Sequence, residues 1–121
     1  MSAGQPHVVA LAGEVDHHSS PALRRQLFEV MRDDGRDIVV DLSEVNFIDS
    51  TTLGVLLDVR RRLITANRVL SLVCSDRNIL RLLELTAFDR LFRVHPSLDD
   101  ALRSPDWGDP AGKAVISGEG R

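Results

Sequence analysis

The chain contains 121 residues, of which 43% are hydrophobic, and its 15 basic and 18 acidic side chains give a formal net charge of −3. This length fits one ordinary domain. The slightly acidic balance argues against general nucleic-acid binding, which requires a basic face. The single cysteine, Cys74, excludes an internal disulfide and a CxxC zinc site.

No apolar run approaches the roughly 20 residues of a membrane span, and the N-terminal stretch lacks the basic start of a signal peptide. We therefore expect a cytoplasmic protein that does not enter a membrane. Residues 104–121 combine four glycines and two prolines with scattered charges, and Trp107 is their lone aromatic residue. We expect this segment to be a flexible tail that follows a domain over residues 1–103.

Strand-like and helix-like segments alternate before the tail. Short apolar runs rich in β-branched residues predict strands, and apolar residues at helical spacing behind capping residues predict helices. Asp76 and Ser97 are the predicted N-caps of the last two helices. In chain order, the predicted elements are a strand over 7–12, a helix from Ser19-Ser20-Pro21 to Asp34-Gly35, a strand over 37–42, a helix over 51–66, a strand over 69–73, a helix over 76–85, a strand over 91–94 and a helix over 97–103. This order predicts an α/β domain with a mainly parallel sheet.

Signatures of common enzymes are absent from the sequence, which contains neither a G-x-S-x-G elbow nor a GxGxxG or GxxxxGK[ST] phosphate loop. Ser50, Asp49 and His17 or His18 could form a hydrolytic group, but Asp and Ser before a helix are ordinary capping residues. The Asp16-His17-His18 run has metal-ligand residue types, yet neighbouring side chains of an extended segment point in opposite directions. We therefore predict no catalytic residue, cofactor or metal.

The segment 45–57 follows a predicted strand and opens a predicted helix. This places Ser50 or Thr51 at the N-cap or in the first turn, where a capping hydroxyl contributes about 1 kcal/mol. The same position tolerates a phosphate, because free N–H groups and the positive end of the helix dipole favour an anion. The residues alone leave both roles open.

Two stretches resemble a known family. They are Gly13-Glu14-Val15-Asp16-His17-His18-Ser19 and Phe47-Ile48-Asp49-Ser50-Thr51-Thr52-Leu53-Gly54-Val55. In this order, inside an α/β pattern over about residues 7–103, they resemble the signature stretches of STAS-domain anti-sigma factor antagonists. The resemblance implies a STAS fold whose N-terminal edge strand is missing or truncated, because only six residues precede His7.

The resemblance also implies a switch. In this family the unphosphorylated protein binds an anti-sigma factor that is also a serine kinase, and this capture frees a sigma factor to activate transcription. The kinase then phosphorylates the Ser after the motif Asp, and a PP2C-type phosphatase reverses the step. In this sequence the acceptor corresponds to Ser50 after Asp49, with Thr51 and Thr52 as alternative hydroxyls.

The partner surface implied by the resemblance is formed by the helix start and the loop after the first strand. Its expected members are Asp16, His17, His18, Ser19, Asp49, Ser50, Thr51, Leu53, Gly54 and Val55. Leu53 and Val55 could equally belong to the core, and Thr52 stands where the family commonly has Gly, so that its bulk could alter docking. We expect a monomer or a weak dimer. The alternative function is that of a STAS scaffold subunit in a regulatory or transport complex, without a kinase cycle.

Overall fold

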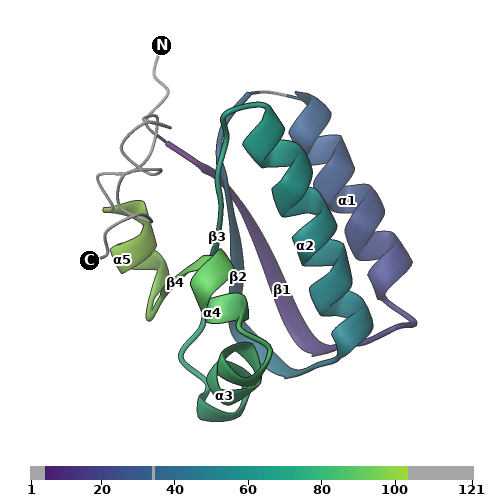
Figure 1. Cartoon of the computed structure of the whole chain (residues 1–121), viewed down its shortest axis with the longest axis vertical. Helices are drawn as coiled ribbons and strands as arrows, with labels where there is room; N and C mark the ends of the chain where they lie inside the picture. The colour runs from purple at the N-terminus through teal and green to yellow at the C-terminus, as the bar shows by residue number, and fades with distance from the viewer. Residues whose placement is uncertain (1–4, 34, 104–121) are drawn as a thin grey trace.

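The computed structural model describes residues 5–33 and 35–103 of the chain. Its elements alternate between strand and helix as predicted, with one additional short helix, α4 (Figure 1). They are β1 (His7–Val15), α1 (Ser20–Asp33), β2 (Ile38–Ile48), α2 (Ser50–Thr65), β3 (Leu70–Val73), α3 (Arg77–Leu85), α4 (Phe88–Leu91), β4 (Arg93–His95) and α5 (Leu98–Leu102).

The four strands form one sheet in the order β1-β2-β3-β4, and every neighbouring pair is parallel. This confirms the predicted parallel sheet. The strand expected to be missing or truncated before His7, and the tail over 104–121 with Trp107, involve positions outside the described residues. None of the helices in the described ranges is long and apolar enough to cross a membrane.

The larger core lies between one face of the sheet and helices α1 and α2, which run side by side along it (Figure 1). Leu27 from α1 and Leu56 from α2 are fully buried there against Val40 and Leu42 of β2. Residues of α3 and the Phe92 ring extend the same core.

The opposite face of the sheet carries a smaller core, where Val39 of β2 and Val73 of β3 pack with Ala101 of α5. The central strand β2 is therefore buried on both faces along its first half. This explains why its sequence is a continuous apolar run and not an alternation of apolar and polar residues.

Both strands that lead to the family motifs are longer than the sequence pattern predicted. Strand β1 does not end at Gly13 but continues to Val15, and β2 continues to Ile48. Gly13 has a φ of 76°, which glycine adopts easily, and the β1–β2 register shifts directly after it. The glycine therefore accommodates an irregularity inside the strand, and the sheet carries both motifs to one edge.

The later elements follow their capping residues. Asp76 accepts a hydrogen bond from the backbone of Ile79, and Ser97 accepts one from that of Asp100, as their predicted cap roles require. The predicted strand over 91–94 is displaced, because Leu91 completes α4 and β4 begins only at Arg93. A short apolar run did not distinguish a helical turn from a strand.

Candidate functional site

The two family motifs meet where β1 and β2 end. Val15 and Ile48 are paired residues at the ends of these parallel neighbours, so Asp16 and Asp49 leave the sheet at the same edge. In parallel sheets this carboxyl-terminal edge is where loops gather to form binding sites. Segments more than thirty positions apart in the chain thereby form one surface.

Asp49 connects the two segments. It is the N-cap of α2, and its Oδ1 accepts hydrogen bonds from the backbone N and the Oγ1 of Thr52, each at 3.0 Å. Its Oδ2 accepts a hydrogen bond from the backbone N of His17 at 2.9 Å. The cap is thus Asp49, and Ser50 and Thr51 lie in the first turn, which is the second of the two positions that the sequence predicted for them.

The hydrogen bonds on Asp49 also favour its ionised form. The bond from the Thr52 backbone lowers the pKa of Asp49 most, desolvation opposes this, and the Thr52 hydroxyl and His17 lower the pKa further. The net effect is a pKa below the ordinary value of 3.8. A negative charge is therefore held directly before the first helical residue at neutral pH.

Of the three candidate acceptors, Ser50 and Thr51 are exposed in the first turn of α2. Thr52 is fully buried, and its hydroxyl lies 3.1 Å from the carbonyl oxygen of Val15. The prediction of Thr52 as an alternative acceptor is therefore wrong. Its bulk points into the protein, where it joins the helix to the end of β1, and does not face a partner.

Helix α2 turns two of the expected contact residues inward. Leu53 and Val55 are 2% and 5% exposed and belong to the larger core, so their prediction as partner contacts is wrong. Because α2 begins at Ser50, helical spacing directs them toward the sheet. Gly54 between them is exposed, and a Cβ built on it would meet no atom within 4 Å.

The loop before α1 is organised by Asp16 and Ser19. The Asp16 backbone N donates to Ser19 Oγ at 3.0 Å, and the Asp16 carbonyl accepts from the backbone N of Ser19 at 3.0 Å and of Ser20 at 2.9 Å. The Asp16 carboxylate accepts from the backbone N of His18 at 3.0 Å. These bonds close a turn from which the side chains of His17 and His18, 64% and 81% exposed, extend into solvent.

Phe47 is an exposed residue of this edge to which the sequence pattern assigned no role. Its side chain is 48% exposed at the end of β2, opposite Glu14 of β1. An aromatic residue in an apolar strand is usually read as core. Only the packing of the folded chain shows that Phe47 is exposed while Ile48 is buried.

Residues 3–101 match the STAS domain family. The chain is 34% identical over 99 residues to the anti-sigma F factor antagonist of Paenibacillus polymyxa, covering 80% of this chain and 81% of that protein. It is 32% identical over 87 residues to the anti-sigma-B factor antagonist of Staphylococcus aureus strain NCTC 8325 / PS 47, covering 72% and 81%. The crystal structure of an anti-sigma factor antagonist from Mycobacterium paratuberculosis matches with a TM-score of 0.72 at 33% identity, over 79% of this chain and 81% of that one. Family match, relatives and fold agree, and the chain belongs to the STAS-domain family.

Proposed function

We propose that this protein is an anti-sigma factor antagonist controlled at Ser50. Its unphosphorylated form binds an anti-sigma factor with serine kinase activity and frees a sigma factor, phosphorylation of Ser50 ends the binding, and a PP2C-type phosphatase restores it. The observation that carries the proposal is the exposed hydroxyl of Ser50 at the first residue of α2, directly after the capping Asp49. Relatives more than 30% identical are named antagonists of anti-sigma factors.

The position of Ser50 suits a reversible modification. A phosphate there adds roughly −1.5 to −2 charges, which would change the net charge from −3 to about −5. The positive end of the α2 dipole tolerates the added anion, so the fold is retained. The ionised carboxylate of Asp49 lies next to it, so the negative charge is concentrated at one point of the partner surface.

The proposed partner surface consists of the exposed side of both motifs together with the end of β2. Its members are His17, His18, Phe47, Ser50, Thr51 and Gly54, while Asp16, Ser19 and Asp49 shape it from behind. The open space around Gly54 supports this assignment. A glycine inside a helix costs about 1 kcal/mol of stability relative to alanine. Within the described residues, no atom would clash with a Cβ at this position, so the fold itself does not explain the glycine. Close approach of a partner backbone would account for the glycine at this position.

Gly54→Ala should therefore separate stability from binding. We expect the free energy of unfolding to rise by about 0.5–1 kcal/mol, because alanine is the better helix former. The affinity for the cognate anti-sigma factor should fall roughly ten-fold, because a methyl group in a packed interface costs on the order of 1–3 kcal/mol. Urea unfolding and isothermal titration calorimetry measure the two effects. Gln26→Ala, exposed on α1, is the matched control, and unchanged affinity of Gly54→Ala would remove Gly54 from the interface.

Phosphorylation itself is tested by intact mass. After incubation with the cognate anti-sigma factor and Mg-ATP, the wild-type chain should gain one phosphoryl group, whereas Ser50→Ala should gain none. Thr51→Ala is the matched control, since it removes the neighbouring exposed hydroxyl and should be modified like the wild type. If Ser50→Ala were phosphorylated as much as the wild type, the acceptor would be another residue. Binding without any modification would instead support the scaffold function.

A further inference from the structure

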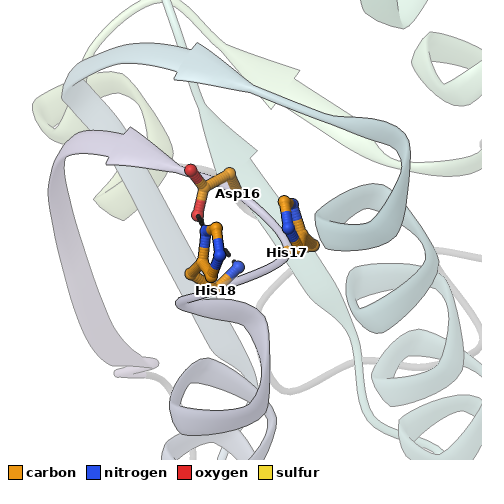
Figure 2. A group of neighbouring side chains, drawn as sticks. All are labelled: Asp16, His17 and His18. Atoms are coloured by element: carbon orange, nitrogen blue, oxygen red, sulfur yellow. Dashed lines mark hydrogen bonds and ion pairs between the residues drawn. The ribbon is translucent and has the colours of Figure 1, made fainter.

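The loop between β1 and α1 brings three potential metal ligands together (Figure 2). One ligand atom from each of Asp16, His17 and His18 lies within 4.8 Å of the other two. The two imidazole rings have centroids 4.0 Å apart, and His18 Nδ1 lies 3.8 Å from Asp16 Oδ1. The expectation that these side chains point apart is wrong, because the segment is a closed turn and not an extended strand.

We propose that this loop binds one divalent transition-metal ion of the zinc type, through the Asp16 carboxylate and a ring nitrogen from each of His17 and His18. Zinc bonds to imidazole nitrogen and carboxylate oxygen are about 2.0–2.2 Å long, so two ligand atoms of a tetrahedral zinc ion lie about 3.3–3.6 Å apart. The present spacing of up to 4.8 Å must therefore contract by roughly 1.2–1.5 Å. Both histidine side chains are mostly exposed and can rotate to provide this contraction.

The surroundings of the loop favour a cation. Asp49 Oδ2 lies 3.8 Å from His17 Nδ1 and adds a second negative charge beside the site, and water can fill the fourth position of a tetrahedral ion held by the three protein ligands. The hydrogen bonds from the Asp16 backbone N to Ser19 Oγ and from the His18 backbone N to the Asp16 carboxylate already hold the turn, so little conformational freedom is lost when the ion binds. Two imidazoles select zinc, cobalt or nickel over magnesium and calcium, which prefer oxygen ligands.

The inference is tested by titrating the untagged, metal-free full chain with Zn²⁺ in a calorimeter. We expect one ion per chain, undisturbed by excess Mg²⁺, and zinc-induced shifts of the His17 and His18 ring protons in NMR spectra. His17→Asn and His18→Asn should each weaken binding by at least about ten-fold. His7→Asn is the matched control, because it removes a histidine at the far end of β1 and should leave the affinity unchanged.

The side chains of His17 and His18 are exposed, so both variants should unfold at the wild-type temperature when metal is absent. Absence of zinc binding to the wild-type chain would overturn the proposal. Undiminished binding to the His17→Asn/His18→Asn double variant would overturn it as well. Neither result depends on whether the protein binds an anti-sigma factor, so the metal site and the proposed function are tested independently.

Discussion

Ser50→Asp should weaken binding of the cognate anti-sigma factor more than about 100-fold, which corresponds to a loss of roughly 3 kcal/mol. The substitution places a second carboxylate beside the ionised Asp49, on a surface that would be desolvated in the complex. The melting temperature should stay close to that of the wild type, because Ser50 is exposed and an acidic residue in the first turn of a helix is favourable. Calorimetric titration and a thermal melt of the same samples measure both.

Ser50→Asn is the matched control for this charge effect, since asparagine has nearly the same shape as aspartate without the charge. We expect it to bind substantially better than Ser50→Asp, and the difference should shrink at high salt as the repulsion is screened. If both variants lost affinity equally, bulk and not charge would end the binding. Wild-type affinity of Ser50→Asp would contradict control at this residue.

Leu53→Ala should lower the free energy of unfolding by about 2–5 kcal/mol, as truncation of a fully buried leucine does. Leu53 is only 2% exposed and contacts the larger core, so its removal leaves a cavity between α2 and the sheet. The folded protein should still present Ser50, Thr51 and Gly54 and bind its partner. We therefore expect unchanged affinity at a temperature well below the unfolding midpoint.

Leu85→Ala provides the comparison, because Leu85 is 76% exposed at the end of α3 and its truncation should change stability by no more than about 0.5 kcal/mol. Urea unfolding of both variants compares the costs directly. If Leu53→Ala kept the wild-type stability but no longer bound the anti-sigma factor, Leu53 would be a partner contact after all.

Much of the fold could be read from local sequence signals. Apolar spacing and capping residues predicted the alternation of strands and helices, the parallel sheet and the caps at Asp76 and Ser97. These features depend on residues a few positions apart, so a linear pattern contains them. The same pattern ended β1 too early at Gly13, because glycine both ends strands and permits irregularities within them.

The site itself required the tertiary structure. Each residue turns a helix by about 100°, so the way α2 packs on the sheet decides which of its side chains face inward. Thr52, Leu53 and Val55 therefore turned out to be buried, although their types alone allowed exposure. The bond from His17 to Asp49 joins residues 32 positions apart and depends on β1 and β2 being parallel neighbours.

The same distinction holds for the Asp16-His17-His18 turn. Its residue types, like Ser50, the proposed acceptor, and the order of the two motifs, are visible in the amino-acid sequence. Their convergence is not, because it follows from backbone hydrogen bonds that close the loop. The amino-acid sequence determines which functional groups the protein carries. The strand register, the packing of α2 and the closure of the loop determine which of these groups lie together, because all three depend on the folded chain.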